Sequence, residues 1–382
     1  MDKHKKILFV IESLTGGGAE KILSVILRNI NTAKFHVTLC CIVNTGQYLK
    51  DIPKNINYKY IISNPKDCKS FWSKLIYNLK YKLVYFWLPL NWVYRLWIPK
   101  GNDIEVAFVE GFTTKLISKS TSSAKKIAWV HIDLINNHWT KITFKNNEDE
   151  AFAYSKFNDI VCVSKKVKQS MSQLGYNIDC LRVLYNPIDD QDIRQLSKDD
   201  SSIKLGSDGT IKLVSTGRLV NQKGYDRLLS IIKRLKDDGL NVSLTILGEG
   251  SDRKILEEYI KSNNLANHVF LPGFVDNPYA IMAQHDIFVC SSRSEGYSTA
   301  VTEALILGMP VVTTDCSGMK ELLGENNEYG IVTQNNDESL YQGIKELLEN
   351  DKLIEHYREK ALLRSRDFSL HSLMNSIEDI FQ

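Results

Sequence analysis

Short apolar runs alternate with segments of helical periodicity along most of the 382-residue chain. Runs such as Ile7–Ile11 and Ile287–Cys290 have the length of strands that are covered on both faces of a sheet. Because a helix-length segment follows most of these runs, the strands are expected to be parallel and joined by crossover helices. The alternation begins a second time at Ile211–Ser215, so it predicts two Rossmann-like α/β domains in tandem.

The predicted boundary between these domains follows Val183–Asp189. The next stretch, residues 190–209, is rich in Asp, Ser and Gly, as linkers are. The chain also exceeds the length of about 250–300 residues at which single cores usually stop growing. Ligands of doubly wound sheets bind outside the carboxyl ends of the strands, so we expect the substrates in a cleft between the two domains.

Composition and cysteine usage limit the class of protein. Apolar residues make up 43% of the chain and charged residues 24%, which excludes disordered and disulfide-scaffold classes. The seven cysteines are odd in number and lie mostly in apolar runs, so we interpret them as core thiols in a reducing cytosol. The first apolar run ends at Glu12 after five residues, which predicts a strand and not an export signal.

Formal charge is divided unevenly between the two halves. Residues 1–190 carry 27 Lys and Arg against 16 Asp and Glu, whereas residues 191–382 carry 21 against 29. A basic half favours an anionic partner such as a phosphate group, a nucleic acid or a lipid headgroup. A solvated basic face without a partner gives the same counts.

One segment, residues 71–97, departs from the alternation. It holds ten aromatic residues, with seven Lys or Arg in or beside it. Trp and Tyr beside cations suit the headgroup region of a membrane, and the apolar run over residues 83–98 is short for a span of roughly 20. We therefore expect contact with an anionic membrane surface through residues 71–98. The alternatives are a helical hairpin with its aromatic side chains in the core, and a surface that stacks nucleic-acid bases; no RNA-binding motif supports the latter, and no nucleic-acid partner is expected.

Glycines open the first predicted helix. The sequence Thr-Gly-Gly-Gly-Ala-Glu at Thr15–Glu20 follows a strand directly, where backbone N–H groups and the positive end of the helix dipole can meet an anion. Lys21 stands where the dinucleotide fingerprint has its third glycine. The loop is compatible with a phosphate or sugar site and equally with a tight turn.

Charged residues follow strands of the second domain in a similar way. Arg218 and Lys223 leave one strand end five residues apart, in a loop where two cations can converge on a diphosphate, although such surface charges are more often only solvated. Glu295 lies in a later strand-to-helix loop, and Glu303 about a turn and a half into the following helix. The amides of Ser298 and Thr299 open that helix, where a phosphate would bind between the two carboxylates.

Together these motifs resemble the retaining glycosyltransferases of family 4, which have the α/β GT-B fold of two Rossmann-like parallel-sheet domains facing a central cleft. The matching segments are the glycine loop, the Gly-Arg-…-Gln-Lys-Gly run, the Leu-Gly-Glu-Gly turn, the Gly-Phe-Val turn and a Glu-x7-Glu motif, at residues 16–20, 217–224, 247–250, 273–275 and 295–303. The resemblance covers nearly the whole chain and is most specific in its second half. Tyr297-Ser298 departs from the Phe-Gly or Phe-Pro of many members.

The resemblance implies roles for individual residues. Arg218 and Lys223 would hold the diphosphate of a nucleotide-sugar donor. Glu303 would bind the ribose, and Glu295 would contact the transferred sugar. His131 matches the family's first-domain histidine near the sugar, whereas a strand-end histidine without that match is more often structural. The remaining donor-binding positions, on glycine loops, on a turn that meets the base and at a helix N-terminus, are Gly17, Gly18, Gly248, Phe274, Val275, Ser298 and Thr299.

The implied reaction is transfer of a hexose or N-acetylhexosamine from a nucleotide diphosphate sugar, with the anomeric configuration retained and UDP favoured over GDP. The cation pair would neutralise the diphosphate, so we expect neither a metal nor another cofactor. The sequence Asp190-Gln191-Asp192 is interpreted as linker and not as a metal motif. Residues 1–189 would form the acceptor domain and 190–366 the donor domain, and 367–382, with a helix, would cross back to the first domain.

The membrane-facing segment favours a lipid-linked saccharide as acceptor. The protein would then act in the assembly of surface polysaccharides or glycolipids, as a peripheral enzyme on the cytoplasmic, inner face of the cell membrane. Two other functions fit the residues. One is a soluble transferase for a free sugar or sugar phosphate, and the other is a non-catalytic subunit that binds nucleotide sugars in a membrane complex.

Overall fold

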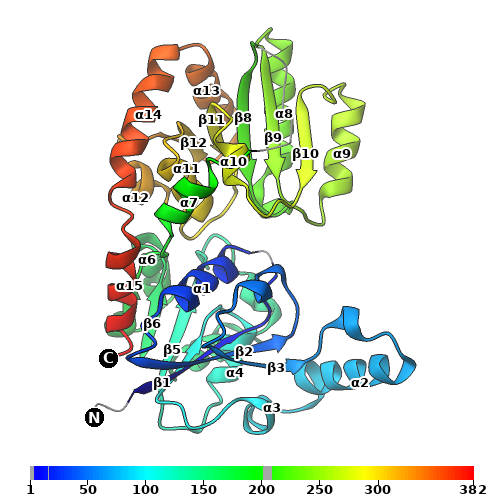
Figure 1. Cartoon of the computed structure of the whole chain (residues 1–382), viewed down its shortest axis with the longest axis vertical. Coiled ribbons are helices and arrows are strands. Elements are labelled where there is room, and N and C mark those ends of the chain that lie inside the picture. The colour runs from blue at the N-terminus through cyan, green and yellow to red at the C-terminus, as the bar shows by residue number, and fades with distance from the viewer. Residues whose placement is uncertain (1–3, 16, 201–208) are drawn as a thin grey trace. The chain divides into compact units, whose positions relative to one another are not determined.

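The computed structural model describes residues 4–15, 17–200 and 209–382, and Figure 1 shows the whole chain. The chain divides into two compact units. The first comprises Met1–Pro187 together with His371–Gln382, and the second comprises Ile188–Leu370. Each unit contains one parallel sheet with helices packed against it. The prediction of two Rossmann-like parallel-sheet domains is therefore confirmed.

Seven parallel strands form the sheet of the first unit, in the order β3-β2-β1-β4-β5-β6-β7. Their bounds are β1 (Lys5–Ile11), β2 (Phe35–Val43), β3 (Asn57–Ile62), β4 (Ile104–Ala107), β5 (Lys125–Val130), β6 (Asp159–Cys162) and β7 (Leu181–Val183). The order reverses between β1 and β4, so the loops at the carboxyl ends of these two strands diverge and leave room for a ligand. The edge strand β3 was not predicted, because four of its six residues are exposed or half-buried and it lacks an apolar run.

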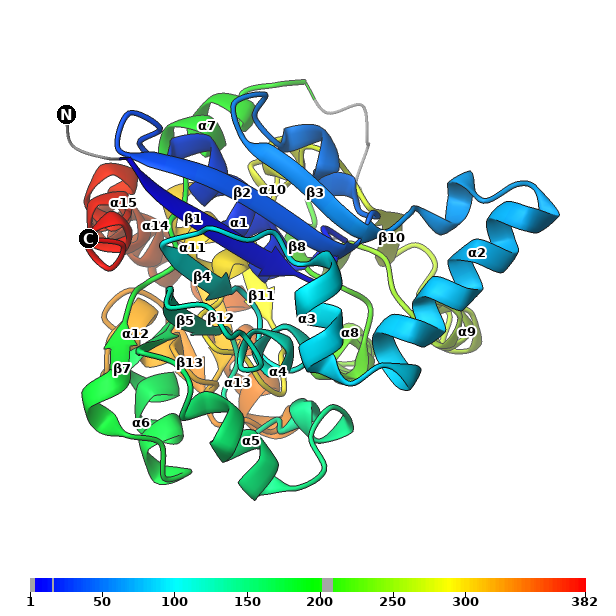
Figure 2. The same ribbon diagram turned by 90° about the horizontal axis from the view of Figure 1, so that it is seen from below.

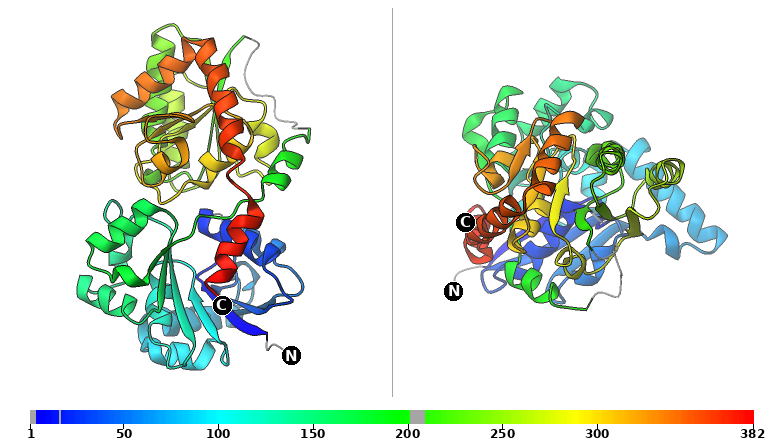
Figure 3. Two further views of the ribbon diagram at one scale, coloured as in Figure 1. Left: turned by 90° about the vertical axis from the view of Figure 1, so that its left-hand side faces the viewer. Right: turned by 90° about the horizontal axis from the view of Figure 1, so that it is seen from above.

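Helices of the first unit connect these strands. Their bounds are α1 (Gly18–Asn29), α2 (Phe71–Lys82), α3 (Leu90–Trp97), α4 (Phe112–Ile117), α5 (Asn147–Tyr154), α6 (Lys165–Gln173) and α15 (Leu370–Asp379). The last turn after α15 contributes Phe381, whose ring lies 5.8 Å from that of Phe9 and 6.0 Å from that of Phe35. The C-terminal residues thus complete the core beside β1 and β2 (Figure 3).

Six parallel strands form the sheet of the second unit, in the order β10-β9-β8-β11-β12-β13. Their bounds are β8 (Ile211–Thr216), β9 (Val242–Leu247), β10 (Val269–Gly273), β11 (Ile287–Cys290), β12 (Val311–Thr314) and β13 (Ile331–Thr333). The order reverses between β8 and β11. Apolar side chains such as Leu213, Ile246 and Val289 are fully buried between the sheet and its helices.

The helices of the second unit include one where a linker was expected. Their bounds are α7 (Asp190–Leu196), α8 (Tyr225–Asp237), α9 (Arg253–Ser262), α10 (Tyr279–Met282), α11 (Thr299–Ile306), α12 (Met319–Leu323), α13 (Asp337–Leu348) and α14 (Asp351–Ser365). The expectation of a linker throughout residues 190–209 is wrong for α7, because the Asp189 carboxylate caps it and Ile193 is buried. The linker residues 201–208 lie outside the described residues.

The aromatic segment forms α2, a π-helical turn over Leu83–Trp87, and α3. The helix α2 projects from the rest of the first unit in Figures 1 and 2. Phe71, Trp72, Phe86, Trp87 and Trp92 are each 50–74% exposed, whereas Tyr94 is buried. The alternative in which the aromatic side chains belong to the core therefore holds for Tyr94 but not for these five. Within the described part of the chain, no helix is long and apolar enough to cross a membrane.

All seven cysteines are free thiols, and six of them are buried. Burial raises the pKa of the Cys40, Cys162 and Cys316 thiols to about 12. These thiols therefore stay protonated and pack as small apolar groups. The prediction of core thiols is confirmed for those six.

Candidate functional site

Three loops of the second unit are joined at the carboxyl edge of its sheet, beside the point where the strand order reverses. The N–H of Gly217 donates to Leu247 O at 3.0 Å, and the N–H of Gly248 donates to Gly273 O at 2.9 Å. A Cβ atom at Gly248 would lie 2.0 Å from Gly217 O, so only glycine allows the loops after β8 and β9 to approach this closely. The loops after β8, β9 and β10 therefore form one continuous edge.

Lys223 and Glu295 meet at this edge. Lys223 ends a 3-10 turn after β8, and Glu295 lies in the loop between β11 and α11. The Lys223 Nζ lies 2.6 Å from Glu295 Oε1, and the Ser292 hydroxyl donates to the same oxygen at 2.5 Å. Burial by itself would lower the pKa of the Lys223 ammonium, but the carboxylate beside it more than offsets this and raises that pKa. Lys223 is therefore a charged side chain in a site from which most water is excluded.

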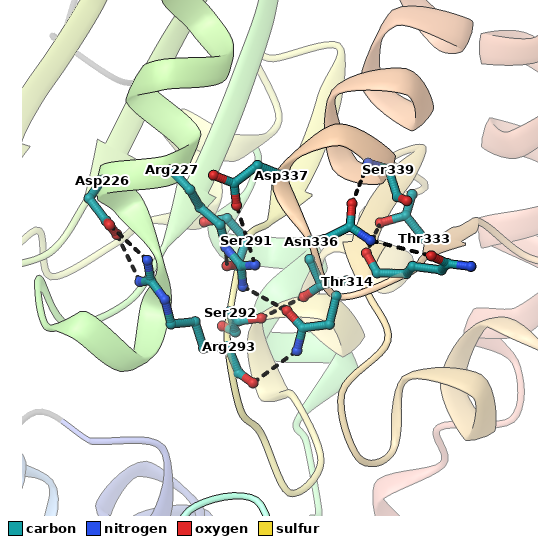
Figure 4. A network of polar contacts seen from close by, with 12 residues as sticks. Asp226, Arg227, Ser291, Ser292, Arg293, Thr314, Thr333, Asn336, Asp337 and Ser339 are labelled. Atoms are coloured by element: carbon teal, nitrogen blue, oxygen red, sulfur yellow. Dashed lines mark hydrogen bonds and ion pairs between the residues drawn. The ribbon is translucent and has the colours of Figure 1, made fainter.

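A polar network holds the loop after β11, which carries Glu295, and Figure 4 shows the part of this network around Ser291 and Ser292. The Arg227 Nε–H donates to Ser291 O at 2.8 Å, and the Thr314 hydroxyl donates to Ser292 O at 2.5 Å. Gln222 donates to Ser294 O at 2.8 Å from the loop after β8. These bonds hold the main chain on both sides of Ser292, so the position of Glu295 is set by the fold before any ligand binds.

The helix α11 begins directly after this loop. Ser298 is its N-cap, and the Ser298 hydroxyl accepts from the Val301 N–H at 3.3 Å. Thr299 is the first helical residue, so the two amides that the sequence singled out lie at the helix N-terminus as predicted. Glu303 is buried farther along α11, where its Oε1 accepts from the Tyr279 hydroxyl at 3.4 Å.

The remaining predicted donor residues also lie at this edge. Arg218 shares the loop after β8 with Lys223, but its side chain is exposed and not buried beside Glu295. Phe274 is exposed and Val275 half-buried directly after β10. The structure thus brings Lys223 and Glu295 into contact. It places Arg218, Phe274 and Val275 on the loops after β8 and β10.

His131 lies at the carboxyl edge of the first sheet, directly after β5. The main-chain N–H of His131 donates to Glu110 Oε2 at 2.9 Å. The ring Nε2 lies 2.8 Å from the carbonyl oxygen of Phe108. A carbonyl oxygen only accepts, so Nε2 carries the proton and Nδ1 keeps a lone pair in the neutral ring. Burial lowers the pKa of His131 to about 4, which keeps the ring neutral at pH 7.

The glycine loop lies at the same edge of the first unit. Gly17 is buried and is the N-cap of α1, and Gly18 is the exposed first residue of that helix. A Cβ atom at Gly17 would lie 2.1 Å from a carboxylate oxygen of Glu20. Gly16, the first glycine of the motif, lies outside the described residues.

Sequence reasoning missed three residues of these edges: Glu110, Ser292 and Tyr279. Glu110 follows β4 closely and is buried, and burial raises the pKa of its carboxyl group. A carboxylate two residues after the predicted strand Ile104–Phe108, followed by Gly111, was a signal that could have identified it. Ser292 and Tyr279 are evident only from their bonds to Glu295 and Glu303.

The aspartates of the Asp190-Gln191-Asp192 sequence lie in the first turn of α7, where the Asp192 N–H donates to the capping Asp189 carboxylate at 3.0 Å. They therefore serve the start of a helix and not a linker. Within residues 4–15, 17–200 and 209–382, no three His, Cys, Asp or Glu side chains form a group that could hold a metal ion.

Comparison with known proteins identifies the family. Residues 197–364 match the family model described as Glycosyl transferases group 1. A Campylobacter jejuni protein is 30% identical over 370 residues, which are 95% of this chain and 96% of that protein. It is named N-acetylgalactosamine-N,N'-diacetylbacillosaminyl-diphospho-undecaprenol 4-alpha-N-acetylgalactosaminyltransferase.

Solved structures show the same fold at low sequence identity. Anabaena HepE, crystallised with UDP and glucose, has a TM-score of 0.75 and 18% identity, with 99% of each chain covered. WaaG, a glycosyltransferase involved in lipopolysaccharide biosynthesis, has a TM-score of 0.67 and 15% identity, with 98% of this chain and 99% of that one covered. The two parallel-sheet units are thus those of the GT-B fold, and the chain belongs to the group 1 glycosyltransferases.

Proposed function

We propose that this glycosyltransferase is a retaining enzyme of family 4 that needs no metal. It would move a hexose or N-acetylhexosamine from a UDP-sugar to a lipid-linked saccharide. The observation that carries the proposal is the contact of the half-buried Lys223 ammonium with the buried Glu295 carboxylate, held by Ser292 at the carboxyl edge of the second sheet. A fixed cation and a fixed carboxylate side by side suit a substrate that joins a diphosphate to a sugar.

The donor would bind across the joined loops of the second unit. Lys223 and the exposed Arg218 would take the diphosphate, together with the amides at the start of α11. Glu303 would bind the ribose and the Phe274–Val275 turn would meet the base. Because two cations and a helix N-terminus supply positive charge, the diphosphate is stabilised without a divalent ion.

The reaction would proceed on one face of the sugar. The bond from the anomeric carbon to the diphosphate breaks, and its electron pair stays on the diphosphate, where Lys223 and Arg218 stabilise it. The acceptor oxygen then bonds to the anomeric carbon from the same side, and its proton passes to the departing phosphate oxygen. Glu295 would stabilise positive charge on the sugar ring. The Nδ1 lone pair of neutral His131 would accept a hydrogen bond from a sugar hydroxyl.

Two of the similar proteins support these substrates. HepE was crystallised with UDP and glucose, and the name of the Campylobacter jejuni relative includes a diphospho-undecaprenol acceptor. The aromatic segment 71–98 agrees with an acceptor of that kind, since six of its rings are exposed in a stretch rich in lysine. We infer a peripheral enzyme on the cytoplasmic face of the cell membrane, in surface polysaccharide or glycolipid assembly.

Donor binding is tested first, by thermal shift of the full chain with UDP, GDP, ADP and their common sugars, in EDTA and then in magnesium. We expect the midpoint of thermal unfolding to rise with UDP and UDP-sugars but not with GDP, ADP or their sugars, and the rise to be the same with and without magnesium. Transfer is then measured to hexose and N-acetylhexosamine mono- and disaccharides on polyprenyl diphosphate, and NMR of the product gives the anomeric configuration. An inverted product, or a requirement for magnesium, would contradict the mechanism.

Membrane contact is tested by flotation with vesicles. We expect recovery with phosphatidylglycerol-containing vesicles and little with phosphatidylcholine alone, and a loss of recovery for Trp72→Ser with Phe86→Ser. The matched control is Ile142→Ser with Ile178→Ser, which removes two exposed apolar side chains of the same unit outside the segment. Equal recovery with both kinds of vesicle, or equal loss in both double variants, would contradict contact of this segment with an anionic membrane surface.

A further inference from the structure

A group of aromatic side chains and carboxyl groups that the donor assignment does not use lies at the carboxyl edge of the first sheet, near His131. Tyr85, Phe112 and Trp139 are each half-buried, so each ring leaves part of its surface open. They come from the π-helical turn, from the first residue of α4 and from the loop after β5. Separate segments thus supply apolar faces to one edge.

Tyr85 joins the aromatic segment to this edge. Its hydroxyl donates to Glu12 Oε1 at 3.2 Å, and Glu12 directly follows β1. The centroid of its ring lies 4.6 Å from that of Phe112. The aromatic segment is therefore attached, through Tyr85, to the place where the strand order reverses.

Trp139 continues the group from Phe112 to His131. A Cβ atom at Gly111, whose φ is +91°, would lie 2.8 Å from Trp139 Cη2, so the ring packs against the main chain beside Phe112. The indole N–H of Trp139 donates to Glu110 Oε1 at 3.0 Å, and the other oxygen of Glu110 accepts from the His131 N–H. One continuous series of contacts thus runs from Glu12 to His131.

The chemistry of this series suits a saccharide. Half-open rings can cover the apolar C–H faces of a pyranose, and a few carboxyl, hydroxyl and imidazole groups among them can bond its hydroxyls. The group holds two carboxyl groups, and none of its six named side chains is a lysine or arginine, so it is unsuited to a phosphate. The diphosphate and lipid of an acceptor are therefore expected elsewhere on the protein.

We propose that Glu12, Tyr85, Phe112 and Trp139 form the subsite that holds the saccharide part of the acceptor beside His131. This inference rests on the proposed function, because it concerns the second substrate of that reaction. Tyr85 belongs to the segment proposed to lie on the membrane. A saccharide joined to a lipid would therefore reach the sheet edge while the lipid stays in the bilayer. Glu110 is a positioning residue, since it holds the Trp139 ring and the His131 main chain and contacts neither substrate.

The test uses the full chain in detergent-free buffer, with farnesyl-diphosphate-linked hexose and N-acetylhexosamine mono- and disaccharides as soluble acceptors. For Tyr85→Phe, Glu12→Gln and Trp139→Phe, we expect the acceptor KM to rise about tenfold or more. The donor KM and the thermal shift with UDP-sugar are expected to stay the same. Tyr60→Phe and Glu148→Gln are matched controls, because both residues are exposed in the same unit outside the subsite.

The outcomes separate this inference from the proposed function. An unchanged acceptor KM in all three variants, or an equal rise in the donor KM, would overturn the subsite and leave the function intact. A wild-type chain that binds no UDP-sugar would overturn the proposed function. A chain that binds UDP-sugar but transfers to none of the acceptors would overturn the lipid-linked acceptor and the subsite with it. Tyr85→Phe removes a single oxygen atom, so unfolding does not obscure the result.

Discussion

The carboxyl edges of the two sheets are built from different chemistry. The edge of the second unit is held by main-chain bonds between glycine loops and carries an ion pair between the half-buried Lys223 and the buried Glu295. The edge of the first unit carries half-buried rings, a neutral His131 and the buried Glu110, whose pKa is raised. A fixed charge pair suits a substrate whose charge changes during reaction, whereas uncharged polar groups and rings suit one recognised by shape and hydroxyls.

The largest effect is expected for Lys223→Ala, which breaks the charged edge. We expect kcat to fall about 100- to 1,000-fold, because a donor to developing charge is lost. Initial rates with UDP-sugar give this value. Lys233→Ala is the matched control, since that lysine pairs with Asp237 on the exposed face of α8. A loss below tenfold, or a similar loss in the control, would show that the second edge does not depend on its fixed cation.

Removal of Glu110 tests the first edge in the same way. Glu110→Ala leaves the His131 N–H and the Trp139 indole N–H without their acceptor, so we expect the free energy of unfolding to fall by about 2–3 kcal/mol. Urea denaturation of both variants provides the comparison, with Glu148→Ala as the exposed control. If Glu110→Ala is as stable as the wild type, the carboxylate does not hold this edge together.

The pH dependence of stability tests the neutral state of His131 at the first edge. The pKa of His131 is lowered to about 4 in the folded chain, against about 6.5 when unfolded. Between these values the unfolded chain binds a proton that the folded chain does not, so stability falls as the pH falls from about 6.5 to about 4. We expect the free energy of unfolding of the wild type, relative to that of His131→Gln, to fall by about 2–3 kcal/mol from pH 7.5 to pH 4.5. A constant difference would mean that His131 is not held neutral by burial.

The smallest effect is expected at the exposed rim of the second edge. Arg293 forms two hydrogen bonds to Asp226, at 2.7 and 2.8 Å, but the Asp226 side chain is 55% exposed and that of Arg293 36% exposed. Asp226→Asn should lower the free energy of unfolding by about 0.2–1 kcal/mol, and less in 1 M salt. Denaturation at low and high salt measures this change. An effect as large as that of Glu110→Ala would mean that the rim supports the edge as strongly as its buried groups.

The sequence predicted the second edge more fully than the first, for a physical reason. Lys223, Glu295 and Ser298 follow strands whose apolar runs are unmistakable, and parallel topology alone brings such residues to one edge. Tyr85, Phe112 and Trp139 come from segments without that pattern, and only packing in three dimensions joins them. Strand β3 and helix α7 were missed because polar residues dominate both and most residues of each are exposed or half-buried, so neither has an apolar run.

The position of Phe381 between Phe9 and Phe35 has a consequence for how the chain is made. The ribosome synthesises the entire second unit after β7 and before the residues that follow α15. The core of the first unit therefore stays incomplete while the second unit is synthesised. The second unit can fold before the first is complete. A chain interrupted within the second unit leaves an apolar surface beside β1 and β2 uncovered, where chaperones and proteases recognise it.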